Sequence, residues 1–470
     1  MIHQMINVFR TIEYVIIIYF IISLGLLIYF KRINNLSKIS QILLKIAIFA
    51  EIFALLITGI LSVLFASLGG DLMMFYLPLA EMILNGQNPY SSAFANSGPL
   101  EYSLFALALL IFNNPRSIAF LFLISYIALV PISYFVLKHI FPEKNGLWYL
   151  FGVSLIFNSV LYFHTTIVTF DDDILFTILL FLMLYLKLRS KNNENSRNIS
   201  YILYIVVLCI ASTVKFFSVL IFILFEILDY QDMKTLIKKL LIGFGFIIIS
   251  FLPFIIIWGI NSVIGPLRFM NQIAYPHMLS LSVILDDLFL IYISYIKIIF
   301  LVVFASSIGL SVILAIKLKP TNFNFIIITI IALISIYFGQ IFLTFWYITW
   351  IIPPLSLFSI YLIDKSKNMS LVIGIFIISI NILSISGHLF EWYTTNHKTP
   401  ELWIIILLFN AIMITLYAIL IKISRDEENI WLKKYSFGIL ILIIITGISL
   451  FTLISMIETL EQLKLIAFFN

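Results

Sequence analysis

The sequence is poor in charged residues and in cysteine. Only 11% of its 470 residues are Asp, Glu, Lys or Arg, whereas 62% are hydrophobic. Soluble domains are about 25% charged, and a soluble chain of this composition could not cover its apolar surface. The single cysteine, Cys209, excludes an intrachain disulfide and a metal site built from several thiolates. The sequence is therefore that of a polytopic integral membrane protein.

Several functional motifs are also missing from the sequence. It contains no glycine-rich phosphate loop, no Walker motif and no pair of zinc ligands at helical spacing, which disfavours nucleotide-driven transport. No internal repeat is visible, and this disfavours many secondary transporters. The net charge of +5 does not indicate nucleic acid as a partner, because in a membrane protein Lys and Arg mark the loops on one side.

Long apolar runs predict an all-α fold with about 11–14 membrane spans. The first run lacks a small-residue cleavage site and is followed by Lys31 and Arg32, so we expect a retained anchor rather than a signal peptide. Residues 104–112 are too short to span alone. Residues 201–228 are interrupted by Lys215, and they either enter and return or cross twice as two short helices. The clear runs cover residues 12–30, 41–66, 117–140, 146–164, 173–189, 240–258, 288–316, 322–341, 347–363, 369–389, 401–422 and 435–457.

The positions of the basic residues predict which loops are cytoplasmic. Basic clusters occur between the first two runs, at residues 187–197, at 234–239, at 317–319, at 365–367 and at 425–434. No Lys or Arg occurs from residue 46 to residue 115, although four acidic residues do. We therefore expect the stretch after the second run to face the extracytoplasmic side, together with residues 163–173, 261–287, 338–347 and 388–400.

The stretch Gly69–Tyr90 predicts an amphipathic helix in this first large outer loop. Asp71 follows two glycines, and Tyr76 belongs to a stripe of apolar and aromatic residues at helical spacing. Asn85 and Gly86 predict the C-terminal end of the helix. Asp71 is either a hydrated group at a helix end or a functional base at the membrane surface.

A second acidic stretch, Asp171–Asp173, begins the apolar run that follows it. Three adjacent carboxylates are expected to be hydrated and to cap a helix start. Alternatively, Asp171 or Asp172 faces the same cavity as Asp71. His164 precedes them and is either a proton carrier or a hydrated surface residue. Carboxylates suit hard divalent cations, but no spacing here requires a metal, so we expect no obligatory cofactor.

Five further residues have side chains that can bind an anion or a sugar. Lys215, in an apolar stretch, either extends to the membrane surface or pairs with an anion such as a phosphate. Arg268 and His277 lie in an outer loop and could hold a phosphate by forked hydrogen bonding. Gln340 and Tyr347 lie at an outer interface, where an aromatic belt accounts for Tyr347 without any function, although sugars also stack on such rings.

Several segments, in order, resemble the GT-C superfamily of glycosyltransferases. They are the Asp71 loop with FYLPLAEMILNGQNPY, Gly98–Tyr102, DDDILFTILLFLMLYLKLR, ASTVKFFSVLIFILFEIL and FLTFWYITWIIPPLSL, and they fall within residues 60–360. More narrowly, the chain resembles the polyprenyl- or dolichyl-phosphate-sugar-dependent mannosyltransferases of the glycosylphosphatidylinositol and phosphatidylinositol mannoside types. It departs from them because Leu72 and Met73 replace the second acid of their D-x-D, and Leu100–Ser103 stands where they carry Tyr-Pro-Pro.

The resemblance implies an inverting enzyme that moves a hexose from a polyprenyl-phosphate sugar to a lipid-linked or protein-linked glycan. Mannose is the hexose that the resemblance favours. It implies Asp71 as general base, with Asp171 or Asp172 supporting the site, and Lys215 and Arg268 at the lipid phosphate. The other expected substrate-binding residues are His164, Tyr76, Glu101, His277, Gln340 and Tyr347. We expect a GT-C-like core at residues 41–365, an extra anchor at 1–40 and further helices at 366–470, in a prokaryotic plasma membrane.

Two other classes of protein stay open on the sequence. A flippase or transporter of lipid-linked oligosaccharide would carry charges deep in several helices, whereas only Lys215 is a candidate for such a charge. An assembly subunit would carry no active site at all.

Overall fold

The protein is an all-α membrane protein, as predicted. The computed structural model describes residues 37–65, 68, 71–92, 95–144, 146–157, 170–192, 197–268, 277–287, 289–344, 346–365, 373–374, 376–377, 379–381, 383–384 and 400–425. The expected anchor at 12–30 and the run at 435–457 lie outside the described residues. The described part includes one parallel pair of two-residue strands, β1 (His277–Met278) and β2 (Phe342–Leu343).

Five described helices are long and apolar enough to cross a membrane. Each matches a predicted run, and their ends differ from the predicted ends by up to seven residues. They are α2 (Lys38–Phe65), α5 (Arg116–Ile140), α11 (Met233–Trp258), α14 (Ile293–Lys317) and α18 (Pro400–Arg425).

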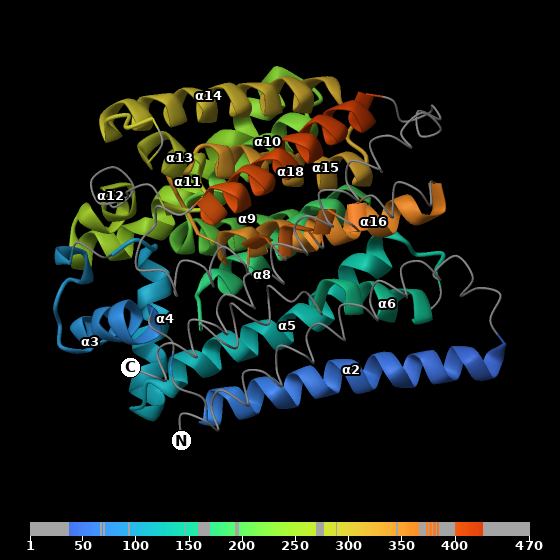
Figure 1. Ribbon diagram of the computed structural model, residues 1–470, viewed down its shortest axis with the longest axis horizontal. Coiled ribbons are helices and arrows are strands. Elements are labelled where there is room, and N and C mark those ends of the chain that lie inside the picture. The colour runs from blue at the N-terminus through green and yellow to red at the C-terminus, as the bar shows by residue number, and fades with distance from the viewer. Residues whose placement is uncertain are drawn as a thin grey trace.

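Shorter helices make up most of the remainder. Those that pack among the long ones are α6 (Gly146–Phe157), α8 (Asp173–Asn192), α9 (Arg197–Val214), α10 (Ser218–Leu228), α15 (Asn322–Phe338) and α16 (Ile352–Lys365). Those that gather at one end are η2 (Leu72–Tyr76), α3 (Leu77–Leu84), η3 (Pro89–Ser91), α4 (Pro99–Phe112), α12 (Asn261–Arg268), α13 (Leu281–Asp287) and η7 (Trp346–Ile351). Helices α3, α4 and α12 lie at the left of Figure 1.

Local sequence explains where several helices begin and end. The Asp232 side chain accepts a hydrogen bond of 2.8 Å from the backbone N–H of Thr235 and so caps the start of α11. Thr321 caps α15 in the same way. Helix α3 ends at Leu84, and Gly86 follows with a positive φ of 71°, as the Asn85-Gly86 pair predicted.

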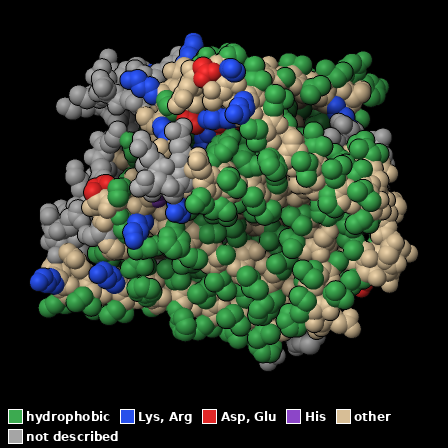
Figure 2. Space-filling model, turned by 180° about the vertical axis from the view of Figure 1, so that it is seen from behind, with side chains coloured by type: hydrophobic (Ala, Val, Ile, Leu, Met, Phe, Trp, Pro, Cys, Tyr) green, Lys and Arg blue, Asp and Glu red, His purple; other side chains and the backbone are tan. Residues whose placement is uncertain are grey.

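Helix α15 forms the centre of the bundle. All of its side chains from Phe323 to Tyr337 are buried, and a helix that is apolar on every side is stable only when it is covered on every side. Helices α14, α16, α10 and α18 pack around it. By contrast, α2, α11 and α14 leave many large apolar side chains exposed, such as Ile256, which is 81% exposed. Figure 2 shows such side chains covering most of one face of the molecule.

The helices alternate in direction between two ends of the bundle. We define the two ends by the residues of α8. The acidic end is where α8 begins at Asp173, and the basic end is where its last turn carries Arg189 and Lys191. The ring of His139, near the end of α5, contacts Tyr185 of α8, so α5 also ends at the basic end. Most Lys and Arg side chains visible in Figure 2 lie toward its left side. The ends of α5 and α8 that carry basic residues therefore lie at the same end of the bundle.

Two segments that the sequence left open are now defined. Residues 201–228 form two helices, because α9 ends at Val214 and α10 begins at Ser218. The 14-residue helix α4 stays at the acidic end, since Asn113, with a φ of 45°, turns the chain there. Helix α5 then starts beside the last turn of α2, where Arg116 donates to the carbonyl of Val63. Residues 99–140 therefore provide one long span rather than two.

A group of buried charges joins α8, α10 and α11 near the basic end. The Lys187 ammonium lies 2.8 Å from Glu226 and 3.0 Å from Asp229, and Lys239 lies 3.1 Å from Asp229 and 3.4 Å from Glu226. Lys187 and Glu226 are fully buried. We call these four residues the Lys187 cluster. Because an unpaired buried charge is unfavourable, the cluster sets the position of α10 against α8.

Replacing Lys187 with Met should destabilise the fold, because it leaves Glu226 buried without its nearest cation. We expect the free energy of unfolding to fall by about 3–5 kcal/mol, as for other broken buried pairs. Thermal unfolding in detergent measures the change. Adding Glu226→Gln should recover part of the loss, and Lys234→Met, on the exposed side of α11, should change nothing. Unfolding of Lys187→Met at the wild-type temperature would contradict this role.

Candidate functional site

The break between α9 and α10 places Lys215 at the acidic end of the bundle. The N–H of Lys215 still donates to the carbonyl of Ala211, and α10 starts three residues later. Lys215 is 8% exposed. The sequence suggested a cation within an apolar helix, but the chain leaves the helix at this residue. The backbone turn itself places the ammonium group at the acidic end of the bundle. The Lys215 side chain therefore does not have to extend along a helix to reach the membrane surface.

The Lys215 ammonium lies among three carboxyl groups. Its Nζ atom is 3.1 Å from Asp172 Oδ2, 4.0 Å from Glu101 Oε2 and 4.0 Å from Asp173 Oδ1. It also donates to Ser97 Oγ at 2.9 Å. We call these five residues the Lys215 cluster.

Lys215 has a donor to spare. An ammonium group has three N–H donors. Within the described residues, Lys215 donates a hydrogen bond to Ser97 and another to Asp172. The other two carboxyl groups are too distant for a hydrogen bond of ordinary length. The remaining donor is therefore available to a ligand oxygen.

The three adjacent aspartates at the start of α8 are buried rather than hydrated. Their exposed fractions are 1% for Asp171, 3% for Asp172 and 0% for Asp173. The expectation of hydration is wrong because the fold supplies partners: Ser97 and Lys215 donate to Asp172, and Trp350 Nε1 donates to Asp173 at 2.8 Å. The positive end of the α8 dipole adds to this.

Asp172 carries the negative charge that Lys215 requires. It lies just before α8, outside the helices. Burial alone would raise the pKa of Asp172, but the Lys215 ammonium and the hydrogen bonds to the carboxylate hold it below its ordinary value. The Lys215–Asp172 contact is therefore an ion pair.

The loop before α4 holds Ser97 against this pair. The backbone N–H of Ser97 donates to the Tyr102 hydroxyl at 2.8 Å, and the Tyr90 hydroxyl donates to the carbonyl of Ser97 at 2.9 Å. Next to it, the N–H of Gly98 donates to the carbonyl of Val214 at 2.9 Å. A Cβ atom on Gly98 would lie 2.0 Å from the Thr213 carbonyl oxygen, so only glycine fits there.

Asp71 lies at the edge of the Lys215 cluster. It is partly exposed and precedes the π-helical turn η2, and such turns are frequent at functional sites. Tyr76 ends this turn with its ring buried. The charges of Asp71 and of all three α8 aspartates act on the Tyr76 hydroxyl, so these groups surround one small region.

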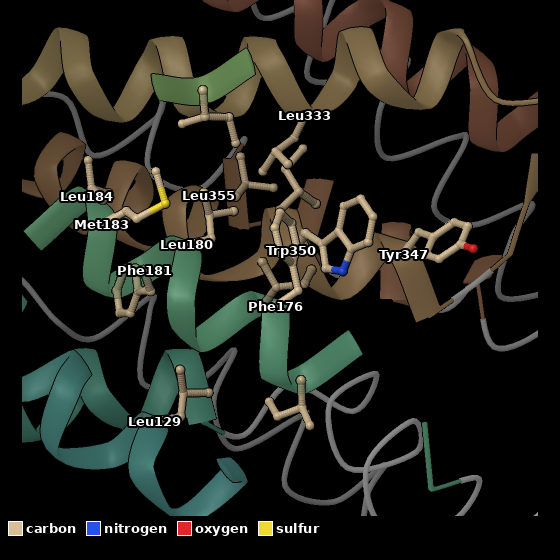
Figure 3. Packing of buried hydrophobic residues seen from close by; sticks show 14 of the residues in the cluster. Leu129, Phe176, Leu180, Phe181, Met183, Leu184, Leu333, Tyr347, Trp350 and Leu355 are labelled. Carbon is tan, nitrogen blue, oxygen red and sulfur yellow. The ribbon is translucent and has the colours of Figure 1, made fainter. Parts of the chain in front are cut away.

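Two aromatic residues of η7 complete the region. The Trp350 ring packs on Phe176 of α8 at a centroid distance of 4.7 Å and on Tyr347 at 5.0 Å. Figure 3 shows Tyr347 beside Trp350 within this packing. Lys215 Nζ lies 5.9 Å from the centre of the Tyr347 ring. Both rings are therefore part of the site rather than of an aromatic belt alone.

The structure brings together most of the residues that the sequence singled out. They are Asp71, Tyr76, Glu101, Asp171, Asp172, Lys215 and Tyr347. Gln340 is buried, and its backbone carbonyl accepts a hydrogen bond from Ser280 near β2 rather than from the Lys215 cluster. His164 lies outside the described residues. Arg268 ends α12 and His277 begins β1, but the side chains of both are outside the described part.

Ser97 is a residue of this site that the sequence did not predict. It bonds both members of the ion pair. A serine in a loop carries no distinctive signal, and only its place before Gly98-Pro99 could have drawn attention to it. In the described residues, no group of three or more His, Cys, Asp or Glu side chains is arranged to hold a metal ion.

Comparisons with known proteins find no family model and no curated protein that matches this chain. Among solved structures, the fold is similar to that of ArnT from Cupriavidus metallidurans bound to undecaprenyl phosphate, with 14% sequence identity and a TM-score of 0.48. The match covers 89% of this chain and 77% of that chain. A likeness at this level carries no inference about the chemistry of the site.

Replacing Gly98 with Ala should displace the loop that holds Ser97. The added Cβ meets backbone atoms of α9, which cannot yield as a flexible side chain would. We expect a loss of about 1–3 kcal/mol in the free energy of unfolding, typical of overpacking. The matched control is Gly245→Ala in α11, where an added Cβ meets nothing within 4 Å. Equal thermal unfolding of both variants would contradict the assigned role of Gly98.

Proposed function

We propose that the chain is a GT-C-type membrane glycosyltransferase that takes a hexose from a polyprenyl- or dolichyl-phosphate sugar. Mannose is the hexose that we propose. The observation that carries the proposal is the buried Lys215 ammonium with a donor to spare, held by Asp172 at one end of an apolar bundle. A phosphate on a lipid would meet this cation at the rim while its tail lay along apolar helices. The ordered resemblance to GT-C enzymes within residues 60–360 supports the same function.

Asp71 would be the general base of the transfer. A hydroxyl of the acceptor glycan or glycolipid attacks the anomeric carbon and loses its proton to the Asp71 carboxylate. The bond from the anomeric carbon to the phosphate oxygen breaks as the new glycosidic bond forms. Attack from the side opposite the phosphate inverts the anomeric configuration. This assignment uses the partial exposure of Asp71, which the α8 aspartates lack.

Lys215 would stabilise the leaving polyprenyl phosphate as charge develops on it. Arg268, at the end of α12, is the second cation that we assign to the phosphate. Asp171 and Asp172 would support the site with their negative charges. Asp172 does so by its ion pair with Lys215. We assign His164, Tyr76, His277, Gln340 and Tyr347 to substrate binding. No step of this chemistry needs a nucleotide sugar or a metal.

We further propose that the site faces the extracytoplasmic side of a prokaryotic plasma membrane. The basic ends of the helices would then lie in the cytoplasm, in keeping with the distribution of Lys and Arg. The partners are the lipid-linked donor, the glycan or glycolipid acceptor and membrane lipids, without nucleic acid. Residues 41–365 would form the catalytic core.

Replacing Asp71 with Asn should slow transfer strongly. General base catalysis contributes about 10²–10⁴-fold, so we expect kcat to fall by at least about 10². The assay follows sugar transfer from a polyprenyl-phosphate donor by purified protein. The matched control is Glu81→Gln, an exposed acid on the neighbouring α3, which should keep wild-type activity. Native activity in Asp71→Asn would show that another group is the base.

The same preparation distinguishes an enzyme from a flippase. Wild-type protein that transfers no sugar but moves lipid-linked sugar across vesicles would overturn the proposed reaction.

Replacing Lys215 with Arg should weaken the use of the donor. Arginine keeps the charge next to Asp172 but places its donors differently. We expect KM for the donor to rise by about tenfold, the effect of one displaced hydrogen bond to a charged group. Initial rates over a range of donor concentrations measure this change. Lys234→Met, far from the site on α11, is the control, and unchanged donor KM in Lys215→Arg would contradict the assignment.

A further inference from the structure

Glu101 is a buried acid that no N–H or hydroxyl donor of the described residues reaches, and its hydrogen-bonding neighbour is the Asp172 carboxyl group. It lies in the first turn of α4 and is 0% exposed. Neither of its oxygens accepts a hydrogen bond within the described residues. Its Oε2 atom is 4.0 Å from Lys215 Nζ, which is an electrostatic contact rather than a hydrogen bond.

The number of charges around Lys215 does not balance if every acid is ionised. Glu101, Asp172 and Asp173 all lie within 4.0 Å of the ammonium. In the described part of the chain, Lys215 is the only cation paired with any of the three. Two surplus negative charges in a buried site are strongly unfavourable, and such groups hold a proton instead. At least one of the three acids is therefore neutral.

Hydrogen bonding identifies which acid holds the proton. Asp172 accepts hydrogen bonds from Ser97 and Lys215, and both favour its charged form. Asp173 accepts one from Trp350. Glu101 accepts none. Because hydrogen bonds from donors stabilise a carboxylate, Glu101 is the least stabilised as an anion.

We propose that Glu101 is a neutral carboxylic acid in the resting protein and that its O–H is a hydrogen-bond donor to the anionic phosphate bound by Lys215. The second half rests on the proposed function, since it needs a phosphate ligand at Lys215. A neutral acid donates to a phosphate oxygen, whereas a carboxylate repels it. Glu101 would thus assist Lys215 without adding a charge.

The proposal predicts a loss of phosphate binding at high pH. Glu101 is neutral at low pH and becomes an anion as the pH rises, and the anion repels the phosphate. Replacing Glu101 with Gln removes this alkaline decline, because the amide keeps a donor and cannot ionise. The charged or titratable groups that face Glu101 are Asp172, Asp173, Lys215, Tyr90 and Tyr102.

Infrared spectroscopy of the ligand-free full-length protein tests the first half. We expect the C=O stretch of protonated carboxyl groups in the wild type, and we expect Glu101→Gln to remove the part of the band that belongs to Glu101. Glu81→Gln, at an exposed site on α3, should leave the band in place. A wild type without the band, or a band whose intensity does not change in Glu101→Gln, overturns the assignment of the proton to Glu101. This readout does not depend on activity.

Binding of polyprenyl phosphate in detergent tests the second half. We expect Glu101→Gln to bind with a Kd within about threefold of the wild type, and Glu101→Met, which fills similar space without a donor, to bind at least about tenfold more weakly. Equal weakening in both variants shows that the carboxylate charge is needed and overturns the proposal. If the wild type shows the band but binds no polyprenyl phosphate, the assignment of the proton to Glu101 stands. The proposed function, which needs a lipid phosphate at Lys215, is then wrong.

Discussion

The ion pair between Lys215 and Asp172 is the constraint on which the acidic end of the bundle depends. It joins the break between α9 and α10 to the start of α8, and Ser97 adds the loop before α4. A buried charge without a partner is strongly unfavourable. Each of these segments must therefore occupy its observed place, because otherwise a charge on another segment would be buried without a partner. The arrangement also keeps the Lys215 ammonium charged although it is shielded from bulk water.

Charge in an apolar context made much of this site predictable. Lys215 and Asp171–Asp173 stand out in the sequence because ionisable side chains near a membrane interior need a reason to be there. Asp71 stood out because it follows the second span, on the side without basic residues. The helical class and the order of the spans follow from hydropathy in the same direct way.

The burial of these charged side chains and the identity of their partners could not be predicted from the same sequence. Three adjacent aspartates look like a hydrated helix start, and only the fold shows that Trp350 and Lys215 reach them. Lys187 resembles the other basic residues that mark a cytoplasmic loop, yet it is buried against Glu226. Ser97 carries no signal, since its importance comes from two contacts made across long sequence separations. Such facts belong to tertiary packing rather than to local pattern.

The two buried charge clusters lie at opposite ends of the same pair of helices, with opposite polarity. At the acidic end the residue before α8 supplies the acid and the turn before α10 supplies the lysine, whereas at the basic end α8 supplies the lysine and α10 the acid. Sliding α10 along α8 by one turn, about 5.4 Å, would break both contacts at once. Axial sliding is thus resisted at both ends, and α8, α9 and α10 form a rigid frame. If the protein binds a lipid as proposed, the opening that admits it is expected in elements outside that frame, such as the helical turns that carry Asp71 and Tyr347.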